Sequence, residues 1–187
     1  MMKHLFFKTI VFLFLFTITS CSESDAPQDQ LPPITQTGAN TFGAVVNGKV
    51  FITKDKTGYT PPGGGTPKGL EVTTGSFLPT YEYFGIDATN YEGIYLYIYI
   101  PKEIPEETIY FFKNSPGVRA SIEKPSYTHV FSIINNTIYA SYEDSGSITF
   151  TKVDYSMGIF SGVFNVTLKN KNNENDIIEI TDGRFDL

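Results

Sequence analysis

Two side chains in this sequence are suited by type to nucleophilic or acid–base chemistry. Cys21 is the only cysteine of the chain, and His129 is the only histidine outside the first twenty residues. A cysteine thiolate is a strong nucleophile, and an imidazole is the side chain that titrates nearest to neutral pH. With a single cysteine the chain forms no internal disulfide, so Cys21 is available for other chemistry.

The residues before Cys21 have the pattern of a secretory signal peptide. Lys3 and Lys8 supply a basic start, and residues 10–16 consist only of Ile, Val, Phe and Leu. A basic region followed by a short apolar run and then small residues is typical of a signal peptide. A membrane-spanning helix needs about 20 apolar residues, so this run is too short to anchor the chain as a helix.

The residues Ile18, Thr19, Ser20 and Cys21 resemble the bacterial lipoprotein signal, or lipobox, with a branched apolar residue at −3 and a small residue at −1. The resemblance implies that the Cys21 thiol receives a diacylglyceryl group and that cleavage makes Cys21 the first mature residue. Two or more acyl chains hold a protein stably on a membrane. The alternative is a signal peptide cut elsewhere, which leaves an unmodified cysteine.

A polar segment, SESDAPQDQLPPITQTGAN, follows Cys21, and its composition predicts a flexible linker over residues 21–40. Ser22 after the cysteine resembles an outer-membrane sorting signal. Glu23, Asp25 and Asp29 also resemble the surface-export signal of Bacteroidota lipoproteins. These residues are equally suited to a plain solvated tether, so periplasmic and surface-facing locations both stay open.

Catalysis has few candidate residues. Ser126 and Ser132 lie near His129 in the sequence, but no G-x-S-x-G motif is present. A single histidine in a strand is more often structural than catalytic. We therefore expect no enzyme activity and no cofactor besides the lipid, and keep an envelope-polymer hydrolase as the least favoured alternative.

Metal ligation also lacks a motif. No His/Cys spacing suits zinc, and no D-x-D-x-D-G loop suits calcium. Asp182 and Asp186, or Glu143 and Asp144, supply carboxylate oxygens, but we expect all four in solvated turns. The sequence predicts no metal site.

A tyrosine-rich stretch is the strongest candidate for a binding surface. In GIYLYIYI, tyrosines alternate with Ile and Leu, so a strand would place them on opposite faces. Pairing with the preceding YEYFGIDA predicts one face with five tyrosines, namely Tyr81, Tyr83, Tyr95, Tyr97 and Tyr99. Such a face suits glycan or peptide binding. The alternative, which we favour, is that these tyrosines only stabilise a two-sided sheet.

The elements that position these residues are strands. Short alternating runs rich in Tyr, Phe, Ile, Val and Thr, separated by Gly, Asn, Asp and Pro, predict an all-β domain over residues 41–187. Short connections favour an antiparallel meander that forms a β-sandwich or flattened barrel. The expected strands are Phe42 to Val46, Lys49 to Thr53, Leu70 to Thr74, Tyr81 to Ala88, Gly93 to Ile100, Ile109 to Phe112, Val118 to Glu123, His129 to Ile134, Thr137 to Tyr142, Ser147 to Asp154, Ile159 to Leu168 and Ile177 to Leu187.

Two local features refine this expectation. Asn47 and Gly48 favour a two-residue type I′ turn and hence a hairpin. The phase of the apolar residues changes between Ile180 and Phe185, which predicts a bulge at Asp182 and Gly183. In contrast, PKEIPEETIY is expected to contain at most one helical turn, near Glu106 and Glu107.

The charge of the chain excludes one class of partner. Residues 1–20 hold two of the fourteen basic residues and none of the twenty acidic ones, so removing them changes the net charge from −6 to −8. An acidic protein without a basic cluster repels phosphate backbones. We therefore expect no nucleic-acid binding.

The ends of the expected domain resemble a family of small Bacteroidota lipoproteins with an uncharacterised all-β domain. The likeness rests on NTFGAVVNGKVF near the start, and on GSITFTK, SGVF and EITDGRFDL near the end. It implies an all-β fold and an envelope location but no activity. The sequence thus predicts an outer-membrane, lipid-anchored protein that binds or scaffolds, with an envelope protein or a glycan as its partner.

Overall fold

The protein is an all-β structure, as the sequence predicts. The computed structural model describes residues 30–75, 82–102, 104, 108–120 and 122–187. Over these residues it has no helix, and so none that could cross a membrane. The strands are β1 (Thr41–Val46), β2 (Lys49–Ile52), β3 (Leu70–Thr74), β4 (Phe84–Thr89), β5 (Ile94–Ile100), β6 (Ile109–Phe111), β7 (His129–Ile134), β8 (Thr137–Ala140), β9 (Gly146–Asp154), β10 (Ile159–Asn170) and β11 (Asn173–Asp186).

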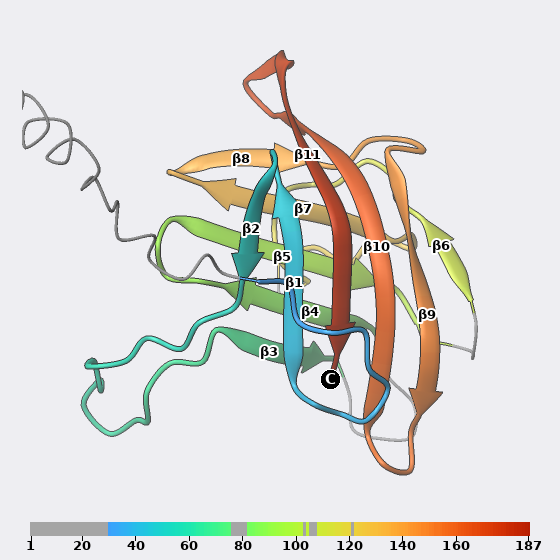
Figure 1. The fold of residues 1–187 in the computed structure, drawn as a ribbon. Helices are drawn as coiled ribbons and strands as arrows, with labels where there is room; N and C mark the ends of the chain where they lie inside the picture. Colours follow the sequence, from blue (N-terminus) through green and yellow to red (C-terminus); the bar gives the residue numbers. More distant parts are fainter. Residues whose placement is uncertain (1–29, 76–81, 103, 105–107, 121) are drawn as a thin grey trace, which may run out of the picture.

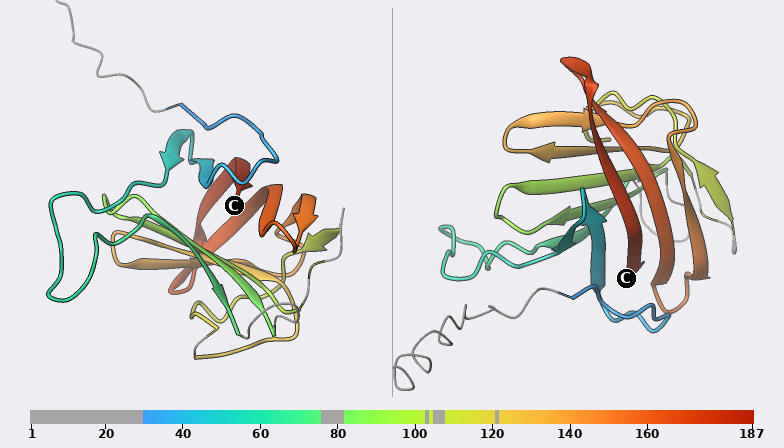
Figure 2. Two further views of the ribbon diagram at one scale, coloured as in Figure 1. Left: turned by 90° about the horizontal axis from the view of Figure 1, so that it is seen from below. Right: turned by 45° about the horizontal axis from the view of Figure 1, so that its top comes forward.

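All strands belong to one antiparallel sheet that curls into a half-barrel. Its main path runs β2-β1-β11-β10-β8-β7-β5-β4-β3, and β9 pairs with both β10 and β6. Two layers result: β1, β2, β9, β10 and β11 cross over β3, β4, β5, β7 and β8 at a steep angle (Figures 1 and 2). Several consecutive strands pair as the expected meander requires, but the order departs from it where β1 pairs with β11, β8 with β10, β5 with β7 and β6 with β9.

The long strand β10 joins the two layers. Its first part pairs with β9, up to Val166 opposite Gly146, and its last residues pair with β8, where Lys169 lies opposite Ala140. Gly146 has a φ of 156° and approaches β10 closely; a Cβ on it would lie 2.1 Å from the carbonyl oxygen of Asn165. The strand order is therefore continuous around the curl.

The main core fills the space between the layers. Phe84 of β4 contacts Phe160 of β10 and Phe150 of β9, with ring centroids 4.8 and 6.2 Å apart. Strand alternation directs these side chains inward, and aromatic pairs at such distances stabilise a core beyond their buried area. On β5, Leu96, Ile98 and Ile100 are fully buried on the same side.

Both turn predictions at the ends of the domain are confirmed. Asn47 and Gly48 join β1 to β2 with φ values of 47° and 77°. The register of β11 shifts at Asp182, whose φ is 52°, so a bulge lies where the apolar phase changes. Gly183 is needed there because a Cβ would lie 2.5 Å from the Phe164 ring.

The structure corrects some expected strands. No strand covers Val118 to Glu123, where the described residues form turns. Strand β4 begins at Phe84 and not at Tyr81, and Tyr81 lies outside the described residues. The helical turn expected near Glu106 and Glu107 also lies outside them.

The segment before β1 is attached to the domain at its C-terminal end. Asp186, 1% exposed, accepts hydrogen bonds from the hydroxyl groups of Thr35 (2.6 Å) and Ser161 (2.7 Å) and from the backbone amide of Gly38 (2.9 Å). The amides of Thr37 and Ala39 and the Thr37 hydroxyl complete the set. Residues 35–39 are therefore part of the folded unit, although the sequence assigns them to the linker.

Candidate functional site

Strand register places the tyrosines of β5 on the outer face of the layer that contains β3, β4, β5, β7 and β8. Tyr97 lies between Asp87 of β4 and Phe131 of β7, and Tyr99 lies opposite His129. The intervening Ile98 points into the main core. The alternation seen in the sequence is thus correct, and it gives this face its own small cluster of aromatic and apolar side chains.

This outer face is covered at Tyr97 and Tyr99, as expected if these tyrosines stabilise a two-sided sheet, and it is not the open tyrosine platform of the less favoured interpretation. Tyr97 and Tyr99 are each 1% exposed. The hydroxyl of Tyr97 accepts a 3.4 Å hydrogen bond from the backbone amide of Ala120, and the hydroxyl of Tyr99 donates to the carbonyl oxygen of Pro125. The segment between β6 and β7 therefore lies over both rings, so they offer no face to a ligand.

The other tyrosines of the set lie at the margins of this cover. Tyr83 stacks on Tyr99 with centroids 5.7 Å apart, and Lys124 lies 5.5 Å from its ring centroid. Tyr95 is half-buried at the opposite end of the strand. Tyr81, the fifth tyrosine, is not among the described residues.

A buried carboxylate organises the covered face. Asp87, 7% exposed, accepts hydrogen bonds from the hydroxyl groups of Tyr95 and Thr73 and forms a 3.0 Å ion pair with Arg119. Burial, followed by the hydrogen bond to Asp87, raises the pKa of Tyr95 well above its usual range. Burial also raises the pKa of Tyr97 to about 12. Both phenols therefore stay neutral donors or acceptors at neutral pH and do not act as bases.

Tyr97 gives the fold a dependence on alkaline pH. Since its pKa is about 12 in the folded state and about 10 when unfolded, the unfolded state loses its proton first. We expect the free energy of unfolding to fall by roughly 2 kcal/mol as the pH rises from 10 towards 12. Urea unfolding at pH 9.5 and 11.5 measures this, and Tyr97→Phe should show a smaller difference between the two values. An equal difference in both proteins would contradict it.

An open pocket lies beside Tyr95, at the end of the sheet where two hairpin turns meet. The turn between β4 and β5 contributes Tyr91, and the turn between β7 and β8 contributes Asn135 and Asn136. Ile133 and Tyr95 line it from the strands, and its volume is about 230 Å³. Of the predicted tyrosines that the structure describes, only Tyr95 lines this pocket, and no pattern in the sequence points to the other lining residues because they come from separate turns.

His129 is buried and lacks the surroundings of a catalytic base. It is 0% exposed, stacks on Tyr99 at 4.8 Å, and its Nδ1 lies 3.0 Å from the hydroxyl of Ser115. Its Nε2 is buried without a hydrogen-bond partner. Burial lowers its pKa to about 4, so the ring is neutral at pH 7. Among the described residues, the hydrogen bond of the imidazole is to Ser115 and not to Ser126 or Ser132; Ser132 donates to the carbonyl oxygen of Tyr95.

The candidate metal ligands are dispersed. Within the described ranges, no group of three or more His, Cys, Asp or Glu side chains is placed to hold a metal ion. Asp186 is occupied by hydrogen bonds and is not in a solvated turn, whereas Asp182 lies exposed 3.8 Å from Arg184. Glu143 pairs with Lys113 at 2.8 Å.

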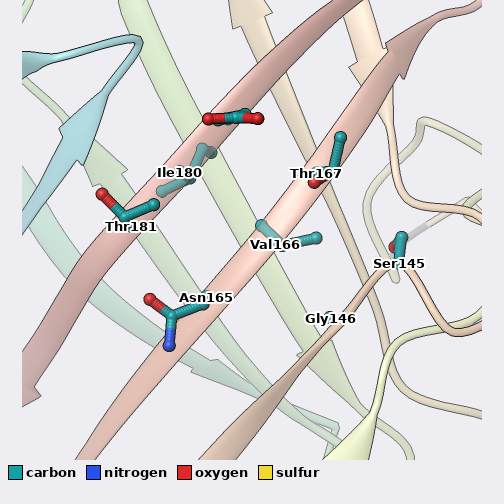
Figure 3. A pocket seen from close by; sticks show the side chains of 8 residues that line it. Ser145, Gly146, Asn165, Val166, Thr167, Ile180 and Thr181 are labelled. Carbon is teal, nitrogen blue, oxygen red and sulfur yellow. The ribbon is translucent and has the colours of Figure 1, made fainter.

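A second hollow lies on the outer surface of the other layer, where β9 begins (Figure 3). Asn165 and Thr167 of β10 and Thr181 of β11 surround it, and the absence of a side chain at Gly146 opens it. It has no aromatic lining residue, and Asn165 already accepts a hydrogen bond from the amide of Asp182. It is less suited to a specific ligand than the pocket beside Tyr95.

No family model, curated protein or solved structure matches the chain.

Proposed function

We propose that this chain is a lipid-anchored protein of the bacterial cell envelope, held by acyl groups on Cys21, whose β domain binds or scaffolds and does not catalyse. The observation that carries the proposal is the position of the only cysteine, directly after Ile18, Thr19 and Ser20 and a short apolar run. The length of the apolar run, the basic residues before it and the spacing to Cys21 all agree with a lipoprotein signal peptide. Several agreeing features make the signal more specific than any one of them.

The anchoring energy is sufficient for this role. Each buried methylene of an acyl chain contributes about 0.8 kcal/mol, so two or more chains hold a protein stably where one holds it marginally. Residues 22–30 separate Cys21 from Leu31, whose side chain lies with that of Pro32 against Gly43 of β1. At most about 3.6 Å per residue, this length allows the domain to reach roughly 30 Å from the membrane.

The proposed location is the outer membrane, facing the periplasm or the cell surface. Ser22 at the position after the cysteine supports outer-membrane sorting, and Glu23, Asp25 and Asp29 support export to the surface. The partner we propose is an envelope protein or a glycan. Of the alternatives, a hydrolase is least favoured, because His129 is buried and its Nε2 has no carboxylate partner.

Replacing the cysteine tests the attachment. In Cys21→Ala we expect an uncleaved precursor to accumulate, because no thiol is present to accept the lipid and processing depends on that step. Immunoblotting of fractionated cells shows the precursor by its larger mass. Ser22→Ala is the matched control, since it changes the neighbouring residue but keeps the thiol, and it should still be processed. Normal processing of Cys21→Ala would contradict the proposal.

A further inference from the structure

We infer that the pocket formed by Tyr91, Tyr95, Asn135 and Asn136 is a binding site for a neutral saccharide. This inference rests on the proposed binding role of the domain and names its ligand class. The site combines two aromatic rings with two side-chain amides, and none of its lining residues is charged.

Both rings are fixed before any ligand arrives. The hydroxyl of Tyr91 donates a 2.9 Å hydrogen bond to the carbonyl oxygen of Lys68, and the hydroxyl of Tyr95 donates to Asp87. Because each phenol is held at its far end, little side-chain freedom remains to be lost on binding. Rigid aromatic rings with few rotatable bonds give contact area at low entropic cost.

The two turns that supply the site are fixed as well. In the β4–β5 turn, the side-chain oxygen of Asn90 accepts hydrogen bonds from the amides of Glu92 (2.9 Å) and Ile94 (3.3 Å). In the β7–β8 turn, the amide of Asn135 donates to the carbonyl oxygen of Gly93 at 3.1 Å, which joins one turn to the other. The pocket is thus built on a connected pair of hairpin ends.

The polar groups of the pocket suit hydroxyl groups. Asn135 and Asn136 both have positive φ values, 49° and 66°, as a tight turn between strands requires. Among the residues that the structure describes, no hydrogen bond occupies the side-chain amides of Asn135 and Asn136, each of which offers donors and an acceptor to the pocket. Sugar hydroxyls donate and accept in the same way, so amides and hydroxyls pair without a net charge on either side.

The surroundings disfavour an extended peptide. Peptides often bind by adding a strand to a free sheet edge. Here β5 pairs on one side with β4 and on the other with β7, so no strand edge is free beside Tyr95. The pocket volume of about 230 Å³ is also too small for a large ligand, and it favours a short stretch of a sugar chain or its end.

Isothermal titration calorimetry on the purified protein tests this inference. The probes are the neutral oligosaccharides maltohexaose, cellohexaose and chitohexaose, with hexagalacturonate and the peptide Ala-Tyr-Ala for comparison. Hexagalacturonate is included because Lys56 lies 5.7 Å from the ring centroid of Tyr91. We expect saturable binding of at least one neutral oligosaccharide, and weaker or no binding of hexagalacturonate and of the peptide.

Matched variants locate the binding. Tyr91→Ala and Asn136→Ala should each weaken it by about tenfold or more, because the first removes an aromatic anchor and the second removes hydrogen bonds to a sugar hydroxyl. Phe111→Ala removes another exposed aromatic ring, on β6 at the other layer, and should change the affinity less than about twofold. Circular dichroism confirms that each variant is folded.

The inference is overturned if no neutral oligosaccharide binds, if the acidic sugar or the peptide binds more tightly, or if Phe111→Ala weakens binding as much as Tyr91→Ala does. The intact mass of the same preparation tests the lipid anchor separately. A protein without acyl groups that still binds sugar would refute the anchor and keep this site.

Discussion

Replacing Asp186 with asparagine is expected to lower the free energy of unfolding by about 3 kcal/mol or more, although it removes only a charge and changes the side-chain volume little. One carboxylate oxygen of Asp186 accepts from the amide of Gly38, and the other accepts from the amides of Thr37 and Ala39. An asparagine has one oxygen and one NH₂ group. Either orientation therefore directs an NH₂ group at a backbone N–H.

This arrangement also explains why Asp186 tolerates burial. Burial alone would raise its pKa, but hydrogen bonds from Thr35, Thr37, Ser161 and Gly38 lower the pKa well below its usual range. Its contribution to stability is present above the ordinary pKa near 4 and is lost as the pH falls below it. The carboxylate form is the one that holds residues 35–39 against the domain.

Urea unfolding at pH 7 measures the effect of Asp186→Asn. Asp182→Asn is the control, because Asp182 lies four residues earlier on β11 with an exposed side chain, and its variant should change stability by less than about 0.5 kcal/mol. Limited proteolysis should also cut the chain faster between residues 30 and 40 in Asp186→Asn. Equal stability of the two variants would show that the hydrogen bonds to Asp186 add little.

Acid is expected to destabilise the protein through His129. Its pKa is about 4 in the folded state and about 6.5 when unfolded, so the unfolded state binds its proton first as the pH falls. Stability is unaffected above pH 6.5, declines between pH 6.5 and 4, and has lost about 3 kcal/mol at the lower end. The cause is that a charged imidazole would be buried beside Tyr99 with no carboxylate partner.

His129→Phe separates this effect from other titrations. The ring keeps its stacking surface against Tyr99 but cannot be protonated, and the hydroxyl of Ser115 still accepts from the amide of Gly117. The variant should lose less stability than the parent protein between pH 6.5 and 4, measured by urea unfolding at four pH values. Parallel curves for the two proteins would mean that His129 does not carry the acid sensitivity.

Alternation was the most informative feature of the sequence for the fold. It assigned the two faces of β5 correctly, because side chains of a strand must point to opposite sides of the sheet. The bulge at Asp182 was predictable for the same reason, since the apolar phase changes there. The turn at Asn47 and Gly48 followed from the positive φ values that these residue types accept.

The cover over the tyrosines was not predictable. The residues between β6 and β7 have no hydrophobic period, and Ala120 and Pro125 use backbone groups to contact Tyr97 and Tyr99. A backbone contact of this kind leaves no pattern in side-chain types. A solvated turn was expected at Asp186 because most of its hydrogen-bond partners, in residues 35–39, lie 147 to 151 residues earlier along the chain.

The pocket beside Tyr95 was not predictable from the sequence either. Tyr91 and Asn136 are typical turn residues when read locally, and nothing in their spacing connects them. They come together only because β5 pairs with β7 and β6 is displaced to the other layer. The glycan alternative suggested by the tyrosine-rich stretch therefore depends on Tyr95 together with residues that the sequence did not single out.

The intact mass of the protein recovered from washed cell envelopes tests the central claim most directly. We expect a chain that begins at Cys21 and carries additional acyl mass on that residue. A protein found in the culture medium, with an unmodified Cys21 or a different first residue, would contradict the account.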